Sequence, residues 1–223
     1  MHFWDHSTPI EEVMSTLNSL IVEGKVHYLG VSDTPSWIVA QANTIATMRG
    51  WAPFVVYQGQ YSLRMRDMDH DVHPMCSALG LGSVPWGVIG GGMLTGKHKP
   101  GESAAADTKR KVRDVTDKDW EIIDEMQKVQ ASMKGETPSL SQIAINWVMS
   151  HAVVTSALIG CRTLAQLEDN LCALNFSLEA SQITALNEIS AIKPIFPHSM
   201  IGHSNIELRS KPWYGAADAI IDL

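Results

Sequence analysis

Short apolar runs alternate with amphipathic stretches along most of the chain. The runs at 26–32, 54–59, 81–89 and 154–160 have the length and the apolar content of buried strands. Between these runs, apolar residues recur at the spacing of a helix that buries one face. The helices predicted by this pattern cover residues 9–24, 35–49, 69–79, 116–134, 138–151, 163–175 and 179–192.

Proline, glycine and acidic residues mark the ends of the first predicted helix. Pro9 suits the first helical position, where its missing N–H is not needed, and Gly24 suits the position after the end. Glu11 and Glu12 in the first turn complement the helix dipole. By contrast, residues 90–115 are rich in glycine and then basic, and this composition predicts a long surface loop.

The alternation of strands and helices predicts a parallel sheet with right-handed crossovers. Because the strand runs are apolar without interruption, both faces of the sheet are expected to be covered. A (β/α) barrel and an open doubly wound sheet both fit this pattern, and periodicity alone does not separate them. No Gly-x-Gly-x-x-Gly motif follows a first strand, and this absence argues against an open sheet that binds a dinucleotide.

Composition narrows the class of protein. The net charge of -7, from 17 basic and 24 acidic residues, argues against nucleic-acid binding. Cys76, Cys161 and Cys172 form no Cys-x-x-Cys pair, which is typical of free thiols in a reducing compartment. No apolar run reaches the roughly 20 residues of a membrane span, and the first residues do not resemble a signal peptide. These features predict a cytoplasmic protein without a membrane partner.

Polar or aromatic residues stand at the end of each predicted strand. Ser32 and Asp33 follow the first, Gln58 ends the second, Trp86 lies in the third, and Arg162 follows the fourth. In parallel α/β folds these ends lie together and carry the ligand site. Arg162 also lies at a predicted helix N-terminus, which favours a phosphate. Each of these residues taken alone is explained more simply as a turn, core or surface residue. Only their occurrence together, at the ends of successive predicted strands, favours a ligand site.

Two histidines, His70 and His73, have a spacing that metal ligands use. No cysteine or carboxylate constellation accompanies them, so the sequence predicts no metal site.

Four segments in this order resemble the aldo-keto reductases. They are GKVHYLGVSD (24–33), VYQ (56–58), PWG with GGGMLTGK (85–97), and LIGCR with QLEDN (158–170). The chain is most similar to the fungal aryl-alcohol dehydrogenase and norsolorinic-acid reductase branch, from His2 to about Ile192. This resemblance implies a (β/α)8 barrel of the TIM type that binds extended NADP(H) without a Rossmann fold.

The resemblance also implies roles for single residues. Ser32, Asp33 and Gln58 would hold the nicotinamide carboxamide, Trp86 would stack on the nicotinamide ring, and His2 would be the active-site histidine that orients a carbonyl. The other implied contacts are Gly87, Gly92, Leu94, Gly96 and Lys97 near the pyrophosphate, Arg162 at the 2′-phosphate, Gly160, Gln166, Asp169 and Asn170 on the adenosine side, and Trp4 and Asp5 beside the substrate.

The chain departs from the family pattern before His2. A complete member has three more strands there, which supply an Asp, a Tyr that acts as general acid and a Lys. None of the three has a counterpart here, because Tyr28, Tyr57 and Tyr61 fall in segments already assigned. The resemblance therefore implies an incomplete barrel in residues 1–193, without the first three strands and most of the fourth. The tail, residues 194–223, is expected to pack on this barrel.

The function implied by the resemblance is an NADP(H)-dependent oxidoreductase that interconverts aryl aldehydes and aryl alcohols. The absent Asp, Tyr and Lys predict impaired catalysis, since hydride transfer to a carbonyl needs a proton donor. The alternative is a non-catalytic cofactor-binding or interaction remnant. An incomplete barrel also leaves open parallel edges, which predicts pairing with a second copy or repacking of the edge.

Overall fold

The computed structural model describes residues 1–99, 115–135 and 137–201. The chain divides into two compact units, Met1–Ala191 and Ile192–Leu223. The described part of the second unit contains the short helix α8 (His198–Ile201). Packing of the tail on the barrel stays a prediction, and most of the tail lies outside the described residues, as does most of the expected surface loop.

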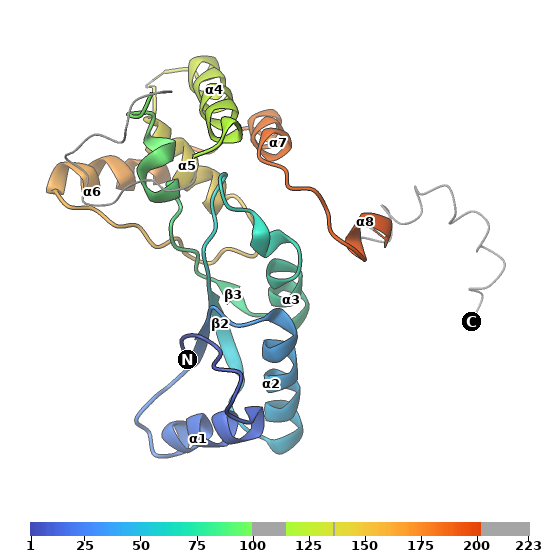
Figure 1. Ribbon diagram of the computed structural model, residues 1–223. Coiled ribbons are helices and arrows are strands. Elements are labelled where there is room, and N and C mark those ends of the chain that lie inside the picture. The colour runs from blue at the N-terminus through green and yellow to red at the C-terminus, as the bar shows by residue number, and fades with distance from the viewer. Residues whose placement is uncertain (100–114, 136, 202–223) are drawn as a thin grey trace. The chain divides into compact units, whose positions relative to one another are not determined.

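Three parallel strands form the sheet of the first unit (Figure 1). They are β1 (Leu29–Ser32), β2 (Phe54–Gln58) and β3 (Gly82–Ser83), in the order β1-β2-β3. The first three predicted strands are therefore confirmed, although each is shorter than the apolar run that predicted it. Successive parallel strands with helices between them make this an α/β fold.

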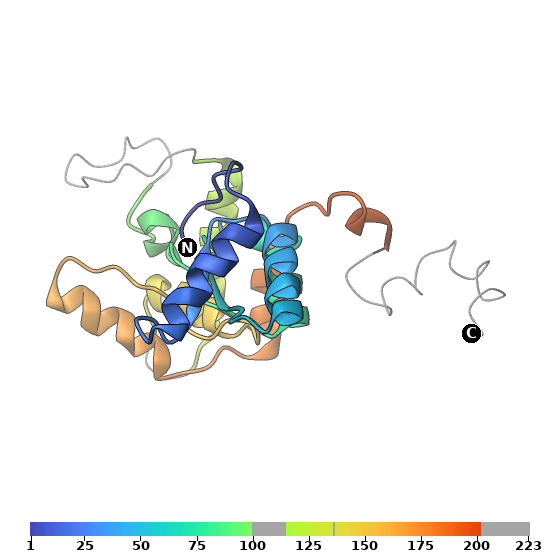
Figure 2. The same cartoon turned by 90° about the horizontal axis from the view of Figure 1, so that it is seen from below.

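Each of these strands follows a helix in the chain: α1 (Ile10–Val22) precedes β1, α2 (Ser36–Arg49) precedes β2, and α3 (Val72–Leu79) precedes β3. Figure 2 shows α1 and α2 beside one another, and they are in contact. Pro9 and Pro35 occupy the N-cap positions, with φ of -57° and -54°. Gly50 and Gly80 end α2 and α3 in the left-handed region, which glycine adopts without a Cβ penalty.

The predicted strand at 154–160 is wrong as a regular strand. This segment lies parallel to β3, with one bridge between Ser83 and Val154 and a 2.8 Å hydrogen bond from the Thr155 N–H to the Ser83 C=O. The backbone of Ser156 forms no hydrogen bond to any residue that the structure describes. The ladder is incomplete because the segment has a strand neighbour on one side only within the described residues.

One face of the sheet is buried. The helices α2 and α3 contact β2 and β3, and the Asn43 side chain of α2 bonds both the N–H and the C=O of Phe54 at 2.9 Å. The side chains buried on this face, each at most 5% exposed, are Leu29, Val31, Phe54, Tyr57 and Ser83.

The opposite face is only partly covered by the residues that the structure describes. A Cβ at Gly30 would lie 2.7 Å from Val56 Cγ1, and one at Gly82 would lie 2.5 Å from Thr155 Oγ1, so these four residues form a row on one face. None of the four is buried. The expectation that both faces are covered is therefore wrong for this part of the chain, because no described segment fully packs on this face.

Four further helices pack together in the first unit. They are α4 (Asp117–Ser132), α5 (Leu140–Met149), α6 (Leu164–Leu171) and α7 (Ala180–Ile189). Helix α5 contacts α4 and α6, and α4 contacts α7. Their core includes Met126, Ile143, Trp147 and Leu186, which are fully buried. Short 3-10 turns at Asp67–Asp69, Gly90–Thr95 and Cys172–Leu174 complete the described helical structure.

Candidate functional site

The structure brings four of the expected site residues to one edge of the sheet. His2 forms a parallel bridge with Ser32, Ser32 pairs with Gln58 in the β1–β2 register, and Gln60 forms a parallel bridge with Trp86. Because all these pairings are parallel, the carboxyl ends of the strands point the same way. His2, Ser32, Gln58 and Trp86 therefore follow one another across the sheet in the order expected from the sequence.

Ser32 carries an unpaired polar atom at this edge. The residue is 7% exposed, and its Oγ is buried without a hydrogen-bond partner among the described residues. Buried hydroxyls are normally paired, since an unmade hydrogen bond costs about 1–3 kcal/mol. A hydroxyl can donate and accept, so Ser32 can bind a ligand group of either kind.

Asp33 is held beside Ser32 in an unusual backbone conformation. Its φ of 48° lies in the left-handed region. The turn is fixed by Tyr57, whose hydroxyl donates to the Thr34 C=O at 2.9 Å and accepts from the Thr34 N–H at 3.3 Å. Burial raises the pKa of Tyr57. The Asp33 carboxylate lies 3.3 Å from Nε2 of His2, whose side chain is 65% exposed.

Trp86 and the glycines after it form a partly accessible loop, in which Trp86 and Gly91 are exposed and Gly90 and Gly92 are buried. Trp86 is 37% exposed, and Gly87 has a φ of 72°. Gly92 has a φ of 100°, and a Cβ there would lie 3.7 Å from Nζ of Lys97. The loop therefore combines a flat aromatic surface with an exposed ammonium group. Leu94, by contrast, is fully buried, so its side chain belongs to the core.

The expected residues on α6 and in the segment just before it separate into two groups. Arg162 and Gln166 are exposed, and the backbone N–H of Arg162 donates to Oε1 of Gln166 at 2.8 Å. Asp169 instead accepts hydrogen bonds from Ser139 Oγ at 3.0 Å and Gln142 Nε2 at 2.7 Å, at the start of α5. Asp169 thus makes a structural contact, while Arg162 is available to a ligand. The other two expected residues are Gly160, which is exposed, and Asn170, which is buried.

Trp4 and Asp5 precede α1. Trp4 is half-buried and packs against the core. The Asp5 carboxylate accepts from the N–H of Ser7 and from the N–H and hydroxyl of Thr8. These bonds, above all the Thr8 hydroxyl bond, lower the pKa of Asp5. Asp5 therefore closes a local turn.

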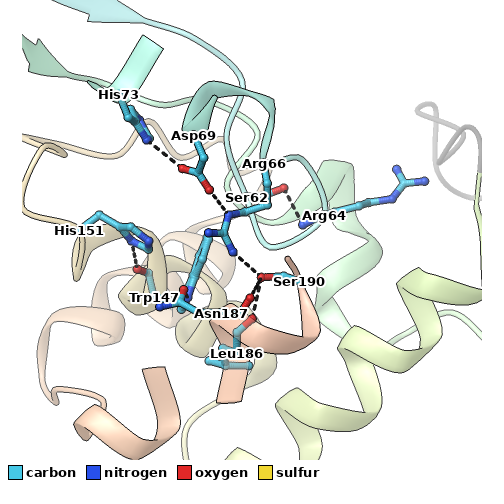
Figure 3. Close-up of polar contacts among 10 residues, drawn as sticks. All are labelled: Ser62, Arg64, Arg66, Asp69, His73, Trp147, His151, Leu186, Asn187 and Ser190. Atoms are coloured by element: carbon cyan, nitrogen blue, oxygen red, sulfur yellow. Dashed lines mark hydrogen bonds and ion pairs between the residues drawn. The ribbon is translucent and has the colours of Figure 1, made fainter. Parts of the chain in front are cut away.

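A second polar cluster, which the sequence patterns did not predict, lies between the sheet and the helices (Figure 3). The Arg66 guanidinium pairs with Asp69 at 2.5 Å, and Asp69 lies 3.3 Å from Nδ1 of His73. Nε2 of His73 lies 3.1 Å from Ser83 Oγ. This order of atoms is that of a Ser-His-Asp triad, but Ser83 is fully buried and no substrate can reach it. The cluster joins α3 to β3.

Aromatic side chains surround the same cluster. Tyr61 stacks on Trp147 with ring centroids 5.5 Å apart, and Trp147 donates from Nε1 to Asn187 Oδ1 at 3.0 Å. Burial raises the pKa of Tyr61, whose hydroxyl lies close to Arg66 and Asp69. The spacing of Arg66, Asp69 and His73, three and then four positions apart, was the only signal of this cluster in the sequence.

The described residues show neither a metal centre nor a membrane helix. No group of three His, Cys, Asp or Glu side chains within them could hold a metal ion. None of the helices seen in the structure is long and apolar enough to cross a membrane. Cys76 is buried, Cys161 and Cys172 are exposed, and all three are free thiols.

A parallel α/β unit with polar residues gathered at the carboxyl ends of its strands is typical of proteins that bind a ligand at those ends. The sequence profile of the Aldo/keto reductase family matches residues 1–191. The chain belongs to this family.

Individual relatives confirm the resemblance to the fungal aryl-alcohol dehydrogenases and norsolorinic acid reductases. A probable aryl-alcohol dehydrogenase of Saccharomyces cerevisiae is 39% identical over 208 residues, which cover 91% of this chain and 62% of that protein. The aryl-alcohol dehydrogenase [NADP(+)] of Phanerodontia chrysosporium is 35% identical, covering 91% and 54%. The norsolorinic acid reductase of Aspergillus flavus is 35% identical, covering 90% and 50%. The chain thus spans 50–62% of the length of these three relatives.

Proposed function

We propose that this chain is the cofactor-binding part of an NADP(H)-dependent oxidoreductase that interconverts aryl aldehydes and aryl alcohols. The buried, unpaired Oγ of Ser32, next to Gln58 and His2, carries this proposal. A nicotinamide carboxamide offers a donor and an acceptor, which these side chains can satisfy. The similarity to a relative named as NADP(+)-dependent supports the same cofactor.

The sheet fits a section of a (β/α)8 barrel wall. The His2 segment, β1, β2, β3 and the segment around Val154 would be five neighbouring positions of the wall, without the first three strands and most of the fourth. The partly open face would line the barrel interior, where side chains of opposite strands fill the space. The small residues Gly30 and Gly82 on that face suit a crowded interior.

The chain's own residues account for each part of the cofactor, which supplies or accepts a hydride when bound. Ser32, Asp33 and Gln58 would bind the carboxamide, and Trp86 would stack on the ring through its exposed surface. The glycine loop would let the backbone approach the pyrophosphate beside Lys97. The 2′-phosphate would meet the exposed guanidinium of Arg162. On the adenosine side, the exposed side chain of Gln166 would contact the cofactor directly. Asp169 and Asn170 would contribute indirectly, by holding α6 in its place.

The substrate would be a small aromatic aldehyde or alcohol near His2. His2 could orient a carbonyl oxygen, and its pairing with Asp33 fixes the imidazole. A proton donor is harder to find among the described residues. The Tyr57 hydroxyl is bound to Thr34, and Tyr61 lies in the buried cluster. These positions favour weak catalysis, and they support a second candidate function, a non-catalytic cofactor-binding remnant.

Titration with NADPH, followed by quenching of tryptophan fluorescence, tests cofactor binding. We expect saturable binding that Trp86→Ala weakens about two- to tenfold, the range of one lost aromatic stacking contact. Trp37→Ala is the matched control, because Trp37 is 63% exposed at the start of α2 and lies outside the row at the strand ends. A chain that binds no NADPH would refute the proposal.

Reduction of veratraldehyde by NADPH separates the two candidate functions. Turnover that Trp86→Ala abolishes and Trp37→Ala preserves supports the oxidoreductase. Saturable NADPH binding without turnover supports the remnant.

A further inference from the structure

Gln60 lies directly beside Trp86, just beyond the last residue of β2, Gln58. Trp86 donates its N–H to the Gly59 C=O at 2.9 Å, and its C=O accepts from the Tyr61 N–H at 3.1 Å. These two bonds flank Gln60 and form the parallel bridge between Gln60 and Trp86. Because residues that pair across a sheet project on the same face, the side chains of Gln60 and Trp86 are neighbours.

The alternation of buried and exposed residues along this segment shows on which face Gln60 projects. Tyr57, Gly59 and Tyr61 are buried, whereas Gln58 and Gln60 are exposed. Successive side chains of a strand project to opposite faces, so Gln58 and Gln60 share the partly open face of the sheet. Gln60 therefore belongs to the same side of the sheet as the expected carboxamide contact, two residues further along the strand.

The backbone at Gln60 is held in place from the buried face. Tyr61 is fully buried, and its ring stacks on Trp147 with centroids 5.5 Å apart. A Cβ at Gly59 would lie 2.7 Å from Sδ of Met68, so only glycine allows this close packing. A binding group on such a support loses little conformational freedom when it meets a ligand.

The amide of Gln60 is accessible and has no partner in the described part of the chain. The side chain is exposed, and it forms a hydrogen bond with none of the residues that the structure describes. Gly87, with a φ of 72°, turns the chain close to this side chain. A Cβ at Gly87 would lie 3.4 Å from Cγ and 3.7 Å from Nε2 of Gln60, so a larger residue at position 87 would crowd the amide.

We propose that Gln60 is a further cofactor-binding residue, whose amide hydrogen-bonds a polar group on the nicotinamide half of NADP(H). This inference rests on the proposed function, in which Trp86 stacks on the nicotinamide ring and Ser32 and Gln58 bind its carboxamide. Gln60 is level with Trp86 and two residues beyond Gln58, a rise of about 6–7 Å in a strand. A nicotinamide that meets both levels would lie beside Gln60. Since an amide both donates and accepts, it suits a carboxamide or a ribose hydroxyl.

The variant Gln60→Glu tests the inference through the charge of the ring. The nicotinamide ring is positively charged in NADP+ and neutral in NADPH, so a carboxylate beside it should favour the oxidised cofactor. We expect the ratio of the NADPH Kd to the NADP+ Kd to rise about three- to tenfold, the effect of one charge at about 6 Å in a largely aqueous environment. Isothermal titration calorimetry measures both constants. A purely structural defect would weaken both cofactors and leave their ratio unchanged.

The matched control for this variant is Gln41→Glu. Gln41 is exposed on α2, the helix that packs on the buried face of the sheet. The substitution adds the same charge to the protein far from the strand ends. We expect the ratio of the two dissociation constants to stay at the value of the natural chain.

The variant Gln60→Leu tests the hydrogen bond itself. It removes the amide at similar side-chain size and should weaken NADPH binding about two- to tenfold, the range of one hydrogen bond. Adenosine 2′-monophosphate carries the adenosine and the 2′-phosphate but no nicotinamide, so its affinity should not change. Gln41→Leu is the control and should leave both affinities unchanged.

Two results would overturn the role of Gln60 and leave the proposed function standing. They are an unchanged ratio of dissociation constants in Gln60→Glu, and an equal loss of affinity for NADPH and adenosine 2′-monophosphate in Gln60→Leu. A natural chain that binds neither NADPH nor NADP+ would overturn both the role of Gln60 and the proposed function.

Discussion

The guanidinium carbon of Arg66 lies over the indole ring of Trp147, 4.9 Å from the ring centroid. The same guanidinium pairs with Asp69 and donates to Ser190 Oγ at 2.6 Å. It therefore joins the loop after β2 to α5 and to the end of α7 (Figure 3). The Arg66 side chain is 13% exposed, so its charge depends on these partners more than on water.

Replacing Arg66 by methionine should destabilise the protein strongly. Arg66→Met keeps much of the side-chain volume, but it leaves the Asp69 carboxylate without its ion-pair partner. Breaking a mostly buried ion pair in this way costs about 3 kcal/mol, which urea denaturation can measure.

An exposed ion pair provides the control for this variant. Lys128 pairs with Glu125 on α4 at 2.8 Å, and its side chain is 72% exposed. Lys128→Met should therefore change the free energy of unfolding by less than about 1 kcal/mol. Equal losses in the two variants would show that Arg66 is no anchor of the helices.

Acid should weaken the fold through Asp69. Burial alone would raise the pKa of this carboxyl, but the bond to His73 and the Arg66 charge together lower it to about 2. With the folded pKa depressed, the stabilisation is complete above the ordinary value of 3.8 and is lost as the pH falls toward about 2. Urea denaturation across this range should show the loss in the natural chain, and Asp69→Asn should flatten it. The same slope in both proteins would contradict the assignment.

His151 should contribute a separate loss of stability at a higher pH. Burial lowers the pKa of His151, and the charge of Arg66 acts in the same direction. The stabilisation by the neutral imidazole is therefore complete above the ordinary value of 6.5 and is lost as the pH falls through the lowered pKa. His151→Asn can keep the bond that Nδ1 donates to the Trp147 C=O at 2.9 Å. We expect this variant to lose the part of the pH dependence just below 6.5, measured by thermal melting.

The sequence predicted the elements well where local signals decide them. Pro9 and Pro35 mark helix starts, and Gly50 and Gly80 mark helix ends, because φ at these positions is a local property. The strand at 154–160 was predicted from its apolar residues. A regular strand also needs neighbours, however, and the described residues offer it only β3.

The candidate site likewise has features that the sequence predicted and features that only the tertiary structure determines. The order of strand ends predicted that Ser32 and Gln58 would lie close together, because the carboxyl ends of parallel strands meet at one edge, and the two residues are paired in the β1–β2 register. The direction of Asp169 toward α5 and the burial of Leu94 depend on tertiary packing, which no motif encodes. The contact of Arg66 with Ser190 joins residues 124 positions apart, beyond any periodic pattern.

The Tyr57 hydroxyl should matter for both stability and cofactor affinity. Tyr57→Phe removes its two hydrogen bonds to Thr34, which is 2% exposed, and leaves buried backbone groups unpaired. The cost should be about 1–3 kcal/mol in urea denaturation. Because the same bonds hold Asp33 in place, NADPH affinity should also fall. Tyr28→Phe is the matched control, since Tyr28 is 80% exposed, and a similar effect in both variants would contradict the role of Tyr57.

Arg162 and Asp169, seven positions apart, should separate in their effects. Arg162→Ala removes an exposed guanidinium and should lower NADPH affinity while the free energy of unfolding changes by less than about 0.5 kcal/mol. Asp169→Ala removes the acceptor of Ser139 and Gln142 at the start of α5, so it should cost about 1–2 kcal/mol in stability. Titration with NADPH and with NADH distinguishes the 2′-phosphate contact, because only NADPH carries that group. If Arg162→Ala weakens both cofactors equally, Arg162 does not bind the 2′-phosphate, and another cation must do so.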